Sequence, residues 1–145
     1  MYQRIVVGTD GSSTAECAVE VAGGLALLMG ASIHVVSAYK PVPAAAVLAG
    51  VGGGQPRFGK EERSEAEAVL EQATSRLSRV QLPITTVSRL RDAADVLIAV
   101  AAEIDADLIV IGNRGLTGVR RYLLGGVADR VAHHAPCSVH IVHAC

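Results

Sequence analysis

Aromatic side chains are scarce in this chain of 145 residues: they make up 3% of it, and tryptophan is absent. Hydrophobic residues nevertheless account for 50% of the sequence, so the core has to be built from valine, isoleucine, leucine and alanine. Such cores are typical of helices packed on a buried parallel sheet, whose strands are short aliphatic runs. The length fits one domain, and we expect residues 1–145 to form a single one.

An excess of positive charge is also missing, because the formal net charge at pH 7 is −1. Proteins that bind nucleic acids neutralise the phosphates with a basic stripe, and this charge balance does not provide one. We therefore expect no nucleic-acid partner.

No apolar stretch reaches the length of about 18 residues that a membrane-spanning helix requires. An apolar signal core is missing as well, because Arg4 precedes only a short aliphatic run that ends in glycine. Cys17, Cys137 and Cys145 are odd in number and lack a CxxC spacing, so we interpret them as small apolar residues and not as a disulfide framework. These absences together predict a cytoplasmic protein without a membrane partner.

Aliphatic runs alternate along the chain with stretches of helical periodicity. The runs predict strands at residues 32–38, 84–90, 107–111 and 138–142, and a first strand with its exit loop at 4–10. Strict alternation implies a mostly parallel sheet with helices on both faces. Between the second strand and the next helix, residues 40–60 are rich in proline, glycine and alanine, and their role stays open.

The predicted helices have recognisable starts, ends and buried faces. Ser13 and Glu16 have the spacing of a capping box at the start of the first helix, and Gly30 supplies its left-handed end. Asp92 begins another helix, and the last one is expected from near Gly125 to residue 134. The expected buried face of the first helix consists of Ala18, Val21, Ala22, Leu25, Leu28 and Met29. A further helix at 61–80 has the apolar stripe Ala66, Val69, Leu70, Ala73, Leu77 and Val80.

Two glycine-rich segments follow predicted strands at the places where an α/β sheet binds its ligands. The first contains Gly8, Thr9 and Asp10, and the second starts with Gly112 and Asn113. Ligands of open α/β sheets lie beyond the carboxyl ends of the strands. The second segment, residues 112–125, is far longer than the about 2–6 residues normal between a strand and a helix. Its length predicts a functional loop.

A phosphate cradle accounts for this loop. Glycines such as Gly115 let backbone N–H groups approach an anion, and Gly125 and Gly126 stand where a helix N-terminus would attract phosphate. Arg114 adds positive charge, and Asp10 can accept hydrogen bonds from ribose hydroxyls. A turn without a ligand, a helix cap at Asp10 and a solvated surface for the arginine stay open as alternatives.

Other motifs of nucleotide-binding and catalytic sites are missing. The chain contains no GxxxxGK[ST], GxGxxG, GxSxG or HExxH sequence. His140, His143, Cys137 and Cys145 do not repeat a metal-ligand spacing, so no metal site is expected. Beyond Asp10 we find no candidate general base, so at most slow ATP hydrolysis is expected.

The sequence resembles the universal stress protein family, whose ATP-binding members carry the pattern G-x2-G-x9-G-[ST]. Gly112, Gly115 and Gly125 match this spacing, and Gly126 replaces the closing hydroxyl residue. The resemblance covers nearly the whole chain. It includes IVVGTDGS at 5–12, LLGGVADRV at 123–131 and HAPCSV at 134–139.

The resemblance implies a three-layer α/β/α sandwich with a flavodoxin-like sheet of five parallel strands in the order 3-2-1-4-5. It also implies a stress-response or regulatory protein that binds ATP, with or without Mg²⁺, or alternatively cyclic AMP or AMP. Asp10 would then face the ribose or adenine, Gly8 and Thr9 would line the same wall, and the Ala38 backbone would meet the adenine ring. The phosphates would be held by Gly112, Asn113, Arg114, Gly115, Gly125, Gly126 and Val127.

Gly126 departs from the family pattern, because it cannot offer a hydroxyl to a phosphate. A hydrogen bond to a charged group contributes about 1.5–3 kcal/mol, so ATP affinity could fall roughly tenfold or more. The backbone donors remain, and the sequence does not choose between ATP and cyclic AMP.

The last predicted strand, Ser138 to Val142, is an aliphatic edge without lysine or proline, which favours pairing with a second copy in a homodimer. The family resemblance implies the same dimer, and an edge covered by the tail is the alternative. Two other functions stay open. One is a dimeric interaction protein with a degenerate pocket, and the other is an enzyme that activates its substrate by adenylation, with residues 40–60 forming a second pocket.

Overall fold

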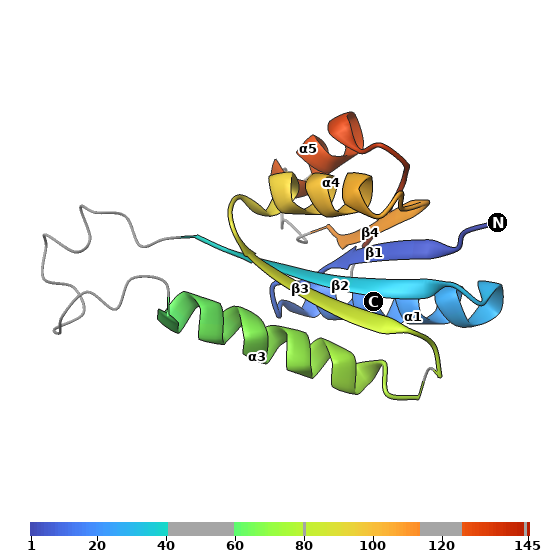
Figure 1. Ribbon diagram of the computed structural model, residues 1–145, viewed down its shortest axis with the longest axis horizontal. Helices are drawn as coiled ribbons and strands as arrows, with labels where there is room; N and C mark the ends of the chain where they lie inside the picture. The colour runs from blue at the N-terminus through green and yellow to red at the C-terminus, as the bar shows by residue number, and fades with distance from the viewer. Residues whose placement is uncertain (41–59, 80, 114–125, 144) are drawn as a thin grey trace, which may run out of the picture.

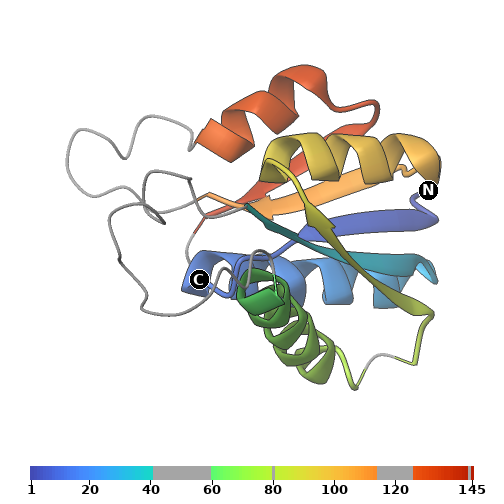
Figure 2. The ribbon, with the colours of Figure 1, turned by 60° about the vertical axis from the view of Figure 1, so that its left-hand side comes forward.

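A computed structural model describes residues 1–40, 60–79, 81–113, 126–143 and 145. A central sheet carries α4 and α5 on one face and α1 and α3 on the other, which gives three layers (Figures 1 and 2). The strands are β1 (Arg4–Gly8), β2 (Ser32–Tyr39), β3 (Ile84–Leu90), β4 (Leu108–Gly112) and β5 (Ser138–Val142). The helices are α1 (Ser13–Met29), α3 (Lys60–Arg76), α4 (Ala93–Glu103) and α5 (Gly126–His134).

The sheet has the predicted strand order, β3-β2-β1-β4-β5, and every described pair is parallel. In the centre, Val6 of β1 lies opposite His34 of β2 and Ile109 of β4. From β1 the chain first adds β2 and β3 on one side of the sheet and then β4 and β5 on the other, so the direction of strand addition reverses between β1 and β4. In an open α/β sheet this reversal places the binding crevice at the carboxyl ends of these strands.

Aliphatic residues of β1 serve both faces of the sheet. Ile5 and Val7 belong to the core that includes residues of α1 and α3, whereas Val6 belongs to the core under α4 and α5. All three are fully buried. Because alternate strand residues point to opposite faces, a run of valine and isoleucine is what a doubly covered strand requires.

The start of α1 differs by one residue from the prediction. Ser12, and not Ser13, is the N-cap, because its backbone is extended and its hydroxyl accepts a hydrogen bond from the Ala15 N–H at 3.4 Å. Glu16 does not complete a capping box, since its carboxylate pairs with Arg76 of α3 at 2.8 Å. The Glu16 side chain therefore joins α1 to α3 and does not cap α1, although the sequence pattern predicts that it does.

The buried face of α1 also differs from the expected one at its end. Leu28 is 84% exposed, whereas Ala18, Ala22 and Ala26 are fully buried against the sheet. At about 100° per residue, Leu28 lies about 120° around the helix axis from Ala22, on the margin of the packed face. Gly30 closes the helix in the left-handed conformation, with φ 66°, as predicted.

Helix α3 follows the stripe predicted for residues 61–80. In α3 the buried residues include Ala66, Leu70 and Ala73, although the helix ends at Arg76 and not near residue 80. Val80 lies outside the described residues. The buried face of α4 contains Val96, Leu97, Val100 and Ala101.

Cys17 of α1 and Cys145 form a disulfide, so the interpretation of the cysteines as unbridged residues is wrong for this pair. Their Cα atoms are 5.9 Å apart, within the usual range for a disulfide, and the sequence separation is 128 residues. Spacing along the chain could not reveal the pair because the fold alone brings α1 and the C-terminal residue together. Cys137 is a free cysteine, and burial raises the pKa of its thiol.

Candidate functional site

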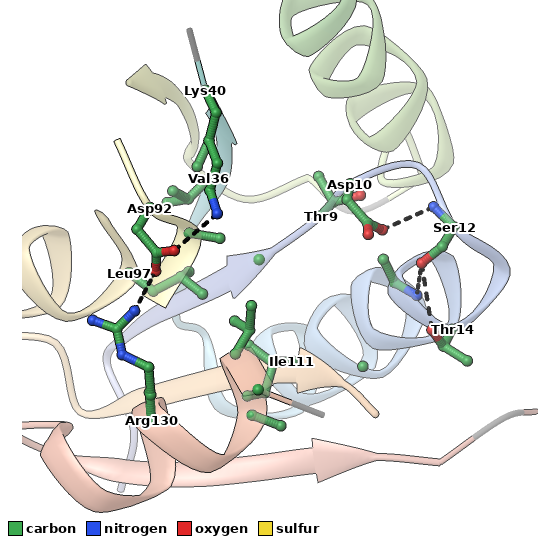
Figure 3. A pocket seen from close by; sticks show the side chains of 18 residues that line it. Thr9, Asp10, Ser12, Thr14, Val36, Lys40, Asp92, Leu97, Ile111 and Arg130 are labelled. Atoms are coloured by element: carbon green, nitrogen blue, oxygen red, sulfur yellow. Dashed lines mark hydrogen bonds and ion pairs between the residues drawn. The ribbon is translucent and has the colours of Figure 1, made fainter. Parts of the chain in front are cut away.

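The carboxyl ends of β1, β2 and β4 surround a cavity of about 590 Å³. Its volume lies in the range of about 300–1,000 Å³ that is typical of small-molecule sites. Figure 3 shows that polar side chains lie on two opposite sides of it, with aliphatic side chains between them. The predicted site residues that line the cavity are Gly8, Thr9, Asp10, Ala38, Gly112, Gly126 and Val127.

The floor of the cavity is aliphatic, and at Gly8 no side chain rises above it. A Cβ atom on Gly8 would lie 3.0 Å from Leu97 Cδ1 and 3.4 Å from Ile111 Cγ2, which is tighter than ordinary contact with Leu97. Val36 and Ala38 of β2 continue the same surface. An apolar surface of this kind suits the face of a planar ring.

Gly112 has a packing requirement of its own at the end of β4. A Cβ atom there would lie 2.5 Å from the Thr14 carbonyl oxygen and 2.9 Å from the Ala15 backbone nitrogen. The end of β4 therefore passes against the first turn of α1 at a distance that only glycine permits. This requirement holds whether or not a ligand is bound.

The side of the cavity next to α1 is lined by Asp10, Ser12 and Thr14 (Figure 3). The Asp10 carboxylate accepts a hydrogen bond from the Ser12 N–H at 3.0 Å, and the Thr9 hydroxyl accepts one from the Gly11 N–H at 3.3 Å. These are local turns before the helix, so Asp10 helps to shape the entry of α1. Its position on the cavity wall also leaves it suitable as an acceptor for ligand hydroxyls.

The start of α5 forms another part of the wall, through Gly126, Val127 and Ala128. The first N–H groups of an α-helix have no partner within the helix, and they carry the positive end of its dipole. Among the residues that the structure describes, none has a heavy atom within 4 Å of the position that a Cβ atom on Gly126 would take. Because Gly126 and Val127 line the cavity, the first turn of α5 is placed where a helix N-terminus can attract an anion.

Opposite Asp10, the cavity is lined by three charged side chains that the sequence analysis did not assign to the site. Lys40 follows β2, Asp92 caps α4, and Arg130 belongs to α5 (Figure 3). The Lys40 ammonium lies 3.1 Å from Asp92 Oδ2, and the Arg130 guanidinium donates to Asp92 Oδ1 at 2.7 Å. Arg130 also pairs with Asp95 of α4.

The Asp92 carboxyl is held in its ionised form. The hydrogen bond from Lys40, then that from the Ala94 N–H and the charge of Arg130, lower its pKa against the opposing effect of desolvation. In the sequence Asp92 was recognised only as a helix start. The available signal was its position just after β3, because the carboxyl ends of all the parallel strands lie at one edge of the sheet.

The remaining predicted site residues do not line the cavity or are not described. Asn113 is buried, its N–H donates to the Val142 carbonyl at 2.7 Å, and its side-chain amide lies 3.5 Å from His143 Nδ1. It therefore joins the end of β4 to the end of β5. Arg114, Gly115 and Gly125 lie outside the described residues.

Within the part of the chain that the structure describes, no group of three or more histidine, cysteine, aspartate or glutamate side chains is arranged to hold a metal ion. In the same residues, none of the helices combines the length and apolar character needed to cross a membrane.

The chain is similar to known proteins over almost all of its length. A family model for the universal stress protein family matches residues 1–143. A universal stress protein of Thermus aquaticus is 36% identical over 145 residues, which cover 98% of this chain and 99% of the relative. Another, from Methanothermobacter thermautotrophicus, is 32% identical over 98% of this chain and 96% of the relative.

Solved structures agree with this result. A universal stress protein crystallised in complex with cyclic AMP has a TM-score of 0.77 and 32% identity, covering 99% of both chains. A universal stress protein from Archaeoglobus fulgidus in complex with dAMP has a TM-score of 0.71 and 28% identity, covering 97% of this chain and 98% of that chain. The matched family model, the fold and the similarity along the whole chain lead to one conclusion: this chain belongs to the universal stress protein family.

Proposed function

We propose that the chain binds an adenine nucleotide in the cavity at the carboxyl ends of β1, β2 and β4, as a single-domain stress-response or regulatory protein. The observation that carries the proposal is the combination of an aliphatic floor beside Gly8 with the N-terminal residues of α5 on the wall of one cavity of about 590 Å³. A base requires the first feature and a phosphate the second.

The proposed roles follow from the positions on the wall. The adenine ring lies on the floor and meets the backbone at Ala38, while the ribose hydroxyls donate to Asp10. Gly8 and Thr9 flank the sugar. The phosphates meet the loop and the helix start at Gly112, Arg114, Gly115, Gly125, Gly126 and Val127. Asn113, whose N–H donates to the Val142 carbonyl, instead supports the loop by joining β4 to β5.

The number of phosphates on the ligand is a separate question. The loop spacing that matches ATP-binding family members favours ATP, with or without Mg²⁺. The solved relatives in complex with cyclic AMP and dAMP favour a nucleotide with one phosphate, which is our second candidate. Gly126 lacks the hydroxyl found in ATP-binding members, and this also favours the second candidate.

Calorimetric titration of nucleotide-free protein with ATP and Mg²⁺, AMP and cyclic AMP tests the proposal. We expect micromolar binding of at least one of them. Gly115→Val should abolish it, because a branched side chain would enter the phosphate loop, while Gly24→Ala on the outside of α1 should not. Absence of binding by all three nucleotides would contradict the proposal and favour an interaction protein with a degenerate pocket.

The sequence also favours a homodimer through β5, whose edge would pair with a second copy across a two-fold axis. Analytical ultracentrifugation with Val139→Lys, which places a charge in β5, tests this arrangement. A cytoplasmic location is part of the same proposal. In that compartment the disulfide between Cys17 and Cys145 would be exposed to cellular reductants.

A further inference from the structure

Four charged side chains, Lys40, Asp92, Asp95 and Arg130, form a cluster beside the cavity, which we call the charged cluster. Asp92 is its centre, because one carboxylate oxygen pairs with Lys40 at 3.1 Å and the other with Arg130 at 2.7 Å. Arg130 reaches Asp95 as well. Figure 3 shows the chain of contacts from Lys40 through Asp92 to Arg130 along one side of the cavity.

The charged cluster is balanced, with two cations and two carboxylates. Both cations therefore already have anionic partners within the protein. The side chains of Lys40 and Arg130 are 70% and 47% exposed, so their charged groups are accessible and not locked in the core. An incoming anion has to compete with the carboxylates for them.

The position of Arg130 makes this competition relevant to a phosphate. It follows Gly126 by four residues on α5, which corresponds to about 6 Å along the helix axis. An arginine side chain can span that distance back towards the start of the helix. A phosphate held at the N-terminus of α5 would then lie within reach of a guanidinium that Asp92 and Asp95 hold away from it.

We propose that Asp92 is a specificity-determining residue, which withholds Lys40 and Arg130 from the ligand and so disfavours nucleotides that carry more phosphate charge. The inference rests on the proposed nucleotide site and adds to it the residue that selects among nucleotides. A carboxylate on the wall repels a polyphosphate directly, and it also neutralises the two cations that would otherwise attract one. Both effects lower the affinity for cyclic AMP and AMP less than the affinity for ATP, because ATP carries more phosphate charge.

A structural staple is the competing explanation, because Arg130 joins α5 to the first turn of α4. A staple alone would stabilise the cavity wall for every ligand equally. Its removal would weaken adenosine, AMP and ATP by the same factor. A specificity residue instead changes the ratio of these affinities, which makes the ratio the decisive measurement.

Asp92→Asn is the central variant, since asparagine preserves the cap of α4 that Asp92 provides to the Ala94 N–H at 3.1 Å. Asp95→Asn is the matched control: it removes the same charge from the same helix and touches Arg130, but Asp95 does not line the cavity. In the double variant, Asp92→Asn frees the Arg130 guanidinium from its ion pair with Asp92, and Arg130→Gln then removes that positive charge.

The experiment is calorimetric titration of these proteins with adenosine, AMP, ATP and inorganic triphosphate, in the absence of Mg²⁺. We expect Asp92→Asn to raise the ratio of ATP to adenosine affinity by about tenfold, the effect of one charge-assisted hydrogen bond. Asp95→Asn should raise it less. The double variant should return most of the way to the wild-type ratio, because the two residues act on each other.

The outcomes separate the inference from the proposed function. Nucleotide binding with an unchanged or lowered ATP-to-adenosine ratio in Asp92→Asn overturns the inference and leaves the proposed function intact. If no protein binds a nucleotide, the proposed function fails. In that case, stronger binding of inorganic triphosphate by Asp92→Asn than by the parent supports the claim that Asp92 withholds Lys40 and Arg130 from anions. Unchanged binding of triphosphate overturns that claim as well.

Discussion

At the end of β4, one missing methyl group decides how closely the sheet approaches α1. The position of a Cβ atom on Gly112 lies 2.5 Å from the Thr14 carbonyl oxygen, and that neighbour is backbone, which cannot rotate away. The glycine was recognised in the sequence as part of a loop that approaches phosphates. Its contact with α1 was not predictable, because it depends on how a helix far away along the chain packs on the sheet.

Gly112→Ala should therefore lower the free energy of unfolding by about 1–3 kcal/mol, the usual cost of overpacking. Urea denaturation of the variant and the parent measures the difference. Gly24→Ala is the control, because no described residue has an atom within 4 Å of its Cβ position on α1, and it should raise stability by about 0.5–1 kcal/mol. Equal stability of parent and Gly112→Ala would contradict the close approach.

Secondary structure elements were predictable where the local sequence carries the whole signal. The bounds of β3 and β5 agree with the prediction, because apolar and β-branched runs end at clear breaks. The start and last turn of α1 were less predictable. Ser12 and Ser13 can both cap a helix, and the choice depends on the turn formed by Asp10 and on Glu16 pairing with Arg76.

The starts of β1 and β4 are joined by a single carboxylate. Asp107 Oδ2 accepts hydrogen bonds from the N–H groups of Gln3 and Arg4, both at 2.8 Å. The bond from Gln3 is the main cause that lowers the pKa of Asp107. A carboxylate with a lowered pKa in the folded state stabilises the fold above its ordinary pKa, and this contribution is lost as the pH falls through the lowered value.

Asp107→Asn should accordingly reduce stability at pH 7 and weaken the loss of stability on acidification below about pH 4. Urea midpoints measured at pH 7 and pH 3 give both effects. Glu65→Gln, at an exposed position of α3, provides the matched change of charge. A pH dependence identical to that of the parent would show that Asp107 does not link protonation to folding.

On the scale of the whole molecule, the disulfide connects residues that are 128 positions apart. A bridge of this span restricts the unfolded chain strongly, and a typical contribution is about 2–4 kcal/mol. Reduction by a dithiol, which supplies two electrons and two protons, should lower the urea midpoint of the parent. Cys145→Ser should be unaffected by reductant and resemble the reduced parent, whereas Cys137→Ser should retain the full response.

If the parent and Cys145→Ser unfolded alike in oxidising buffer, the disulfide would contribute nothing to stability. Thiol counting on the unfolded proteins before and after reduction checks that the bridge is present in the sample.

The candidate site was predictable to the extent that its residues follow strands in the sequence. Asp10 and Gly112 were assigned to one crevice because the alternation of elements predicts a parallel sheet, and α5 was expected close behind the loop. The contacts among Lys40, Asp92 and Arg130 were not predictable. These contacts connect the end of β2, the start of α4 and α5, and the spacing of the three residues along the chain does not indicate that they lie close together.

Nuclear magnetic resonance titration of ¹⁵N-labelled protein with cyclic AMP and with ATP tests the central claim most directly, because it reports binding and location together. The account predicts saturable shifts of the backbone amides of Gly8, Thr9, Gly126 and Val127, with little change on the outer face of α3. Shifts confined to other surfaces, or none at millimolar nucleotide, would contradict an adenine-nucleotide site at the carboxyl ends of the strands.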